Sequence, residues 1–112
     1  VAYIRERMPK SIPIISNGNI ITYDDAIQNL ESTGSDGVMS AEGILDNPAL
    51  FAGKNCEKLR TELALEYMDM VDRYGPVKMK SIIFHIRRIC KDAFDRYQLL
   101  EDCMACTDKD AA

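Results

Sequence analysis

The sequence predicts an α/β fold built on a parallel sheet, followed by an all-α segment. Two short apolar runs, Ile12–Ile15 and Gly37–Ser40, are separated by one helical pattern, and each leads into a small polar turn. From about Gly53 onward, apolar residues instead recur at three- and four-residue steps, which is the period of an amphipathic helix. This change of period predicts a boundary between two parts of the chain, residues 1–53 and residues 54–112.

The first part has the order helix, strand, helix, strand. A short opening helix ends at Pro9, and the next helix begins at a capping box of Thr22 and Asp25 and ends at Gly34. Strands joined through a helix pair in parallel, with a right-handed crossover. We expect the first strand to be buried on both faces, which two strands alone cannot achieve. A larger α/β body outside this chain is therefore expected, and periodicity leaves open whether it is an open sheet or a closed barrel.

The second part is expected to form an αα-hairpin. Its first helix ends at Tyr74-Gly75-Pro76, and its second helix is expected to run unbroken from about Val77 to Leu100. The apolar face of the first helix consists of Leu59, Leu63, Tyr67, Met70, Val71 and Tyr74.

The composition is that of one ordinary soluble domain, with 112 residues, 46% hydrophobic and 29% charged. No apolar run approaches the roughly 20 residues needed to span a bilayer, and the first residues lack a signal-peptide layout. Because the chain does not begin with Met, we expect it to be a segment of a longer protein. Its four cysteines are too few and too unevenly spaced for a disulfide scaffold, which favours a cytoplasmic or nuclear location.

The net charge of −4 hides an uneven distribution. From Asp24 to Asp46 there are six acids and no Lys or Arg, whereas Arg73 to Tyr97 holds seven bases and two acids. The polar side of the second expected helix carries a basic stripe, consisting of Lys80, Arg87, Arg88 and Lys91. Such a stripe is either a solvated helix face or a surface for RNA phosphates.

Each predicted strand leads into a turn suited to an anion. The two turns are Asn17-Gly18-Asn19 and Ser40-Ala41-Glu42-Gly43, and each lies close to a helix start. Successive backbone N–H groups in such turns are donors that can hold a phosphate, and loops of this kind bind phosphate in (β/α)8 barrels. The alternative is that both are merely tight connections between a strand and a helix.

These motifs together resemble the C-terminal part of the tRNA-dihydrouridine synthases, most of all the eukaryotic branch acting on the D-loop near positions 16 and 17. The resemblance rests on Ile12–Ile20, Thr33–Gly43, Asn47–Phe51 and Glu66–Val71, and it continues into the basic helix. It implies the last part of a TIM barrel carrying FMN, followed by a helical domain that helps to hold tRNA. It also implies that NADPH reduces the flavin, which passes a hydride to C6 of a uridine while a cysteine protonates C5.

The resemblance assigns roles to particular residues. Asn17, Gly18 and Asn19 match the first flavin-phosphate loop, and Ala41 and Glu42 match the second. Many relatives have Gly-Arg at the second position, so here the contact is expected from backbone N–H groups. The role of the Glu42 side chain is thereby in doubt, since a carboxylate repels phosphate unless it points away or pairs.

No cysteine of the chain inherits the catalytic role, because the family's cysteine lies well upstream. Cys56 lies at the expected boundary, Cys90 on the buried side of a helix, and Cys103 and Cys106 in an acidic tail. The spacing of the last two is that of a metal or redox motif, but no second ligand pair accompanies it, so we expect no metal site. His85 is expected on the polar side of its helix, as a solvated or tRNA-facing residue.

Three functions are compatible with the sequence. The first is a segment of an FMN-dependent tRNA-dihydrouridine synthase, inactive without the missing N-terminal barrel half. The second is a helical RNA-binding module without catalysis, and the third is another FMN-binding barrel oxidoreductase acting on a small metabolite. Bound flavin separates the second from the others, and dihydrouridine in tRNA separates the first from the third.

Overall fold

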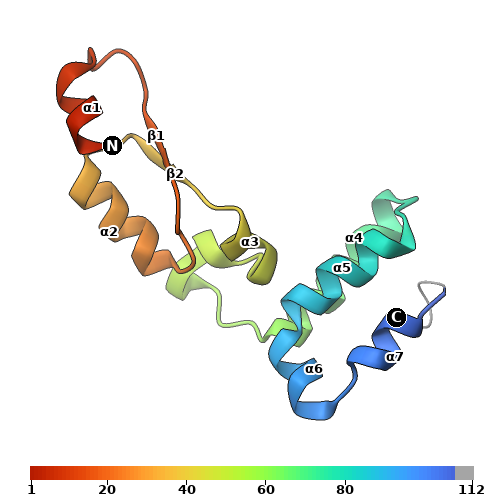
Figure 1. The fold of residues 1–112 in the computed structure, drawn as a ribbon. Helices are drawn as coiled ribbons and strands as arrows, with labels where there is room; N and C mark the ends of the chain where they lie inside the picture. The colour runs from red at the N-terminus through yellow and green to blue at the C-terminus, as the bar shows by residue number, and fades with distance from the viewer. Residues whose placement is uncertain (108–112) are drawn as a thin grey trace. The chain divides into compact units, whose positions relative to one another are not determined.

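The computed structural model describes residues 1–107. Figure 1 shows the elements in chain order: α1 (Ala2–Arg7), β1 (Ile15–Asn17), α2 (Tyr23–Thr33), β2 (Gly37–Met39), α3 (Glu42–Asp46), the 3-10 helix η1 (Leu50–Asn55), α4 (Arg60–Tyr74), α5 (Met79–Ile89), α6 (Lys91–Tyr97) and α7 (Leu100–Ala105). They form two compact units. The α/β unit comprises Val1–Ile44 and Ala49–Cys56, and the helical unit comprises Leu45–Pro48 and the chain from Glu57 on.

The sheet of the α/β unit is a parallel pair. β1 and β2 align with Ile15 opposite Gly37 and Asn17 opposite Met39, and α2 is the crossover between them. The predicted strand–helix–strand arrangement is therefore confirmed. Because the register places Asn17 and Met39 side by side, both strands end at the same edge.

Local sequence signals fix both ends of α2. The backbone N–H of Asp25 donates to Thr22 Oγ1 at 3.1 Å, and the backbone N–H of Thr22 donates to Asp25 Oδ2 at 2.8 Å. Hydrogen bonding from Thr22, above all from its backbone N–H, lowers the pKa of the Asp25 carboxyl. Gly34 ends the helix in the left-handed conformation with φ of 62°. The predicted capping box and glycine stop are both confirmed.

One face of the sheet is covered and the other is open. Ile20, Ala26 and Leu50 form the core of the α/β unit, with Val38 packed against them. Ser16 is buried, but its neighbour Ile15 is 56% exposed. Within the described chain only one layer covers the strands, so burial of the first strand on both faces stays a prediction about the longer protein. An exposed apolar strand face is what a sheet presents where a further layer is missing.

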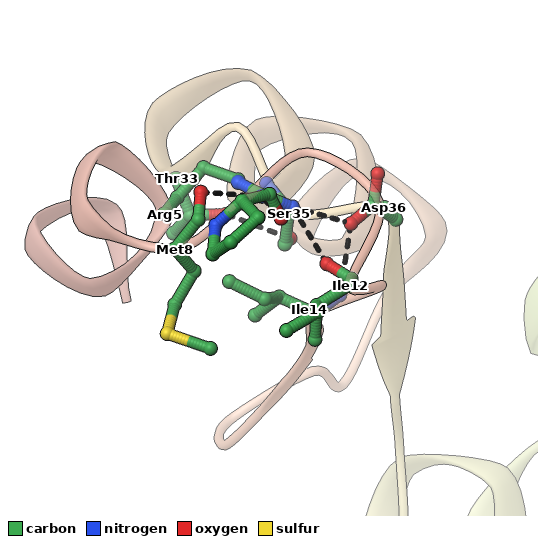
Figure 2. A network of polar contacts seen from close by, with 8 residues as sticks. Arg5, Met8, Ile12, Ile14, Thr33, Ser35 and Asp36 are labelled. Carbon is green, nitrogen blue, oxygen red and sulfur yellow. Dashed lines mark hydrogen bonds and ion pairs between the residues drawn. The ribbon is translucent and has the colours of Figure 1, made fainter.

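Arg5 connects α1 to the segments that precede β1 and β2 (Figure 2). Its guanidinium donates to Asp36 Oδ2 at 2.8 Å and to backbone carbonyl oxygens of Met8, Pro9 and Ile12. The same carboxylate oxygen of Asp36 accepts from the backbone N–H of Ile14 at 2.8 Å. The side chain of Arg5 is only 14% exposed, so this network replaces much of its hydration.

Replacing Arg5 by alanine is expected to lower the free energy of unfolding by about 1.5 kcal/mol, the lower end for hydrogen bonds to a charged group. The lower end applies because the side chain of Asp36 is 48% exposed and water can replace part of the lost contact. Denaturant unfolding of the full-length protein measures the loss. Glu6→Ala is the matched control, since Glu6 belongs to an exposed pair with Arg7. A loss in Arg5→Ala no larger than in Glu6→Ala would contradict the assignment.

The helical unit is built on the hairpin of α4 and α5, as predicted. Its buried apolar residues are Leu63, Ala64, Val71, Ile82, Ile86, Ile89, Cys90 and Cys103. The unit also includes Asp46, whose carboxylate accepts from Arg88 Nε at 2.7 Å and whose carbonyl accepts from Arg60. These two contacts hold the short segment Leu45–Pro48 in the helical unit.

The predicted unbroken helix from Val77 to Leu100 is wrong. The chain bends at Cys90, where φ is −100° and ψ is 18°, and reverses at Gln98, which is left-handed with φ of 57°. The reversal brings α7 back against α5 (Figure 1) and buries Cys103. A straight helix would have left this apolar side exposed, so packing overrides the local helical pattern. Cys103 accordingly lies in a packed helix rather than in the expected acidic tail.

Within residues 1–107, none of the helices is both long and apolar enough to cross a lipid bilayer.

Candidate phosphate site and basic helical hollow

The turns after β1 and β2 face one hollow of about 380 Å³, which we call the phosphate hollow. It is lined by Asn17, Gly18, Asn19, Ile20, Ile21, Met39, Ser40, Ala41, Glu42 and Gly43. All five residues matched to flavin-phosphate loops are among them. The parallel register explains this, because it puts the carboxyl ends of both strands at one edge.

The first turn has a backbone that few side chains tolerate. Gly18 has φ of 133° and Asn19 has φ of 55°. Nothing lies within 4 Å of the position a Cβ of Gly18 would take, so the conformation and not lack of space requires glycine here. Asn is one of the few other residues found in the left-handed region. The Asn-Gly-Asn order thus allows a turn that successive ordinary residues would strain.

The second turn is fastened directly to the first. Ser40 Oγ donates to the carbonyl oxygen of Ile20 at 2.6 Å. A Cβ on Gly43 would lie 2.5 Å from that same oxygen and 2.8 Å from Leu50 Cδ1, so the two turns touch through a glycine. The sequence analysis placed Ser40 and Gly43 in the second turn, but it did not predict their contact with Ile20 or the packing of Leu50 beside Gly43. The glycine that ends the second turn, Gly43, was the one signal that could have pointed to this close approach.

The hydrogen-bond donors that line the phosphate hollow are uncharged groups, and such groups can hold an anion. Glu42 is the only charged residue among those lining it, so no lysine or arginine side chain contributes. Backbone N–H groups of the two turns and the side-chain amides of Asn17 and Asn19 are suitable donors. A flavin phosphate therefore fits the residues present, through hydrogen bonds without a formal positive charge.

Three of the four residues of the predicted basic stripe line one hollow of the helical unit. Arg87, Arg88 and Lys91 line a hollow of about 330 Å³, which we call the helical hollow. Its other lining residues are Asp46, Phe94, Asp95 and Leu100. Lys80 does not line it, although the seven-residue step to Arg87 places both on one side of α5. The side chain of Arg88 is 22% exposed and paired with Asp46, so Arg87 and Lys91 are the more accessible cations.

His85 is not the solvated side chain that its position in the sequence predicted. It is half-buried, and its ring lies 5.2 Å from the ring of Tyr67 on α4 and 5.3 Å from that of Phe84. Burial raises the pKa of Tyr67. These contacts make His85 part of the packing between α4 and α5.

The four cysteines are not among the residues of the phosphate hollow. All four are free thiols, and none lines the hollow. Burial raises the pKa of Cys90 and of Cys103, which disfavours the reactive thiolate form. In the part of the chain that the structure describes, no three His, Cys, Asp or Glu side chains are grouped to hold a metal ion.

A parallel strand pair whose two glycine-bearing turns enclose one hollow is typical of α/β proteins that hold a phosphate group at the carboxyl ends of their strands. The chain belongs to the dihydrouridine synthase family, whose sequence model matches residues 1–111.

Named relatives agree with this assignment. The chain is 37% identical over 99 residues to a tRNA-dihydrouridine(16/17) synthase-like protein of Mus musculus, covering 88% of this chain and 20% of that protein. It is 35% identical over 99 residues to the tRNA-dihydrouridine(16/17) synthase of Saccharomyces cerevisiae, covering 79% and 23%. A Homo sapiens tRNA-dihydrouridine(20a/20b) synthase-like protein is 49% identical over 53 residues, covering 47% and 16%. The resemblance stated from the sequence is confirmed, and the chain spans about a fifth of the length of the mouse and yeast relatives.

Proposed function

We propose that this chain is the C-terminal segment of an FMN-dependent tRNA-dihydrouridine synthase that reduces a D-loop uridine to 5,6-dihydrouridine with NADPH. The observation that carries the proposal is the phosphate hollow, where both turns matched to flavin-phosphate loops meet. The family and the mouse and yeast relatives support the reaction, and the names of those relatives include NAD(P)(+). The alignments with these two relatives cover most of the chain, and both relatives are named for positions 16/17. We therefore propose that the uridine reduced lies at one of these two tRNA positions.

In this proposal the α/β unit is the last part of a TIM barrel and holds the tail of FMN. The bound flavin supplies the hydride for the uridine ring. Asn17, Gly18 and Asn19 hold the phosphate from one side, and the backbone of Ala41 and Glu42 holds it from the other. Ser40 keeps the two turns at a fixed separation through its hydrogen bond to Ile20. The Glu42 carboxylate is expected to point away from the phosphate, because a nearby like charge would weaken binding.

The proton donor of the reaction is proposed to come from outside these residues. None of the four cysteines lines the phosphate hollow. We therefore expect residues 1–112 alone to lack synthase activity. The exposed side chains of β1 and of the segment before it, such as Ile15 and Ile12, are the expected contact for the rest of the barrel.

The helical unit is proposed to hold tRNA through the basic stripe of Lys80, Arg87, Arg88 and Lys91. Phosphate contacts from such a stripe give affinity without reading sequence. The helical hollow is also compatible with a second function, that of an RNA-binding module without catalysis. In that case the stripe would matter and the phosphate hollow would not.

Deleting the gene is expected to remove dihydrouridine from the D-loop of tRNA while the purified full-length protein carries visible flavin colour. The measurements are mass spectrometry of tRNA nucleosides and the absorbance spectrum of the protein. Re-expression of the intact gene should restore the modified base. A colourless protein would favour the RNA-binding module, and flavin without any change in tRNA would favour an oxidoreductase of small metabolites.

A further inference from the structure

The helical hollow is lined by residues of α5, α6 and α7, and the first two of these helices were expected to form one continuous helix. Arg87 comes from α5, Lys91 and Phe94 come from α6, and Leu100 is the first residue of α7. The chain bends at Cys90 and reverses at Gln98, so that α5, α6 and α7 follow one another in different directions (Figure 1). The hollow therefore depends on packing within the helical unit, unlike a plain stripe of bases along one helix.

The charge of this hollow is too small for a surface that follows a duplex backbone. Three bases and two acids line it, which gives a net charge of +1. Asp46 is paired with Arg88 at 2.7 Å, and Asp95 adds a second carboxylate to the lining. A duplex backbone carries a dense row of phosphates and is held by several cations in a line. Carboxylates in the hollow itself would oppose such binding.

The hollow is also partly apolar. Phe94 is half-buried and Leu100 is 41% exposed, so both offer apolar surface beside the cations. A nucleotide that has left its stack carries a phosphate for the cations and a flat apolar face for an aromatic ring. Its base edge also carries donors that a carboxylate such as Asp95 can accept. The volume of about 330 Å³ lies within the range of small-ligand pockets.

We propose that the helical hollow takes one unpaired nucleotide of tRNA, with its phosphate on Arg87 and Lys91 and its base against Phe94. This inference rests on the proposed function for the identity of the RNA. It goes beyond that function by making the helical unit a reader of unpaired nucleotides in addition to a cationic support. Phe94 is then the side chain that separates single-stranded from double-stranded RNA.

The test uses the full-length protein with Phe94→Leu, which keeps an apolar side chain and removes the aromatic face. The matched control is Tyr97→Leu, because Tyr97 lies on the same helix, is 63% exposed and does not line the hollow. Fluorescence anisotropy measures the Kd of a mixed-sequence single-stranded oligoribonucleotide and of the duplex formed with its complement. Phe94→Leu is expected to raise the Kd for the single strand roughly tenfold, because one base–aromatic stack is lost. The Kd for the duplex is expected to stay unchanged.

Two outcomes would overturn the inference. Equal weakening of both RNAs would mean that Phe94 only supports the fold of a cationic face. An unchanged Kd for the single strand would mean that no base lies on Phe94. A wild-type protein that binds the single strand but forms no dihydrouridine would contradict the proposed function, and the comparison between Phe94→Leu and Tyr97→Leu would still decide this inference.

Discussion

Replacing Gly43 by alanine is expected to reduce the flavin content of the full-length protein at least tenfold. The added Cβ would lie 2.5 Å from the carbonyl oxygen of Ile20 and 2.8 Å from both Leu50 Cδ1 and Ser40 Oγ. The Ile20 oxygen belongs to the backbone of the first turn, so relief requires the two turns to move apart. Overpacking of this kind typically costs about 1–3 kcal/mol, and 1.4 kcal/mol is a factor of ten in binding.

The flavin content of Gly43→Ala is measured by the ratio of flavin to protein absorbance, and its affinity by titrating apoprotein with FMN. Gly37→Ala, at the first residue of β2, is the matched control. A Cβ at Gly37 would meet only Ile15 Cδ1, at 2.9 Å, which is the end of a flexible side chain. We expect Gly37→Ala to retain flavin. If both variants bound FMN equally well, the phosphate hollow would not be the flavin site.

The α/β unit was predictable where a short stretch of sequence determines its own conformation. Thr22 and Asp25 form their capping box within four residues, and Gly34 ends the helix by its own backbone preference. The two turns that line the phosphate hollow were predictable for the same reason, since a glycine turn closely follows each strand, whereas their role in binding phosphate stays a prediction. The pairing of Arg5 with Asp36 was missed, because 31 residues separate them and no local pattern reports such a contact.

The helical unit was less predictable because packing decides its path. The sequence pattern from Val77 to Leu100 is helical throughout, yet the chain reverses at Gln98. This left-handed residue could not be predicted, because it is neither glycine nor asparagine. The reversal allows Cys103 to be buried against α5. The position of His85 was misjudged for a related reason, since the polarity of its ring does not indicate the neighbouring ring of Tyr67. Of the predicted basic stripe, the structure gathers three residues at the helical hollow and leaves Lys80 outside it.

Reversing the charge of Arg87 and Lys91 together, as Arg87→Glu with Lys91→Glu, is expected to weaken tRNA binding by the full-length protein at least tenfold. Both side chains are exposed and line the helical hollow, so the change adds repulsion without removing a core contact. Arg88 is unsuitable for this test, because a glutamate there would face its present partner Asp46 and disturb the fold.

The salt dependence of tRNA binding by the same double variant measures how many phosphate contacts are lost. Each lost phosphate contact lowers the slope of log affinity against log salt by roughly 0.7–0.9, so losing the phosphate held by Arg87 and Lys91 should flatten it by about 0.8. Arg73→Glu is the control, since Arg73 is an exposed base on α4 that lines neither hollow. Dihydrouridine formation at saturating tRNA should change little, because neither residue lies at the phosphate hollow. An unaltered affinity and slope in the double variant would refute RNA contact by this face. If Arg73→Glu lowered the affinity for tRNA as much as the double variant does, the effect of Arg87 and Lys91 would be only general attraction between a basic protein surface and RNA.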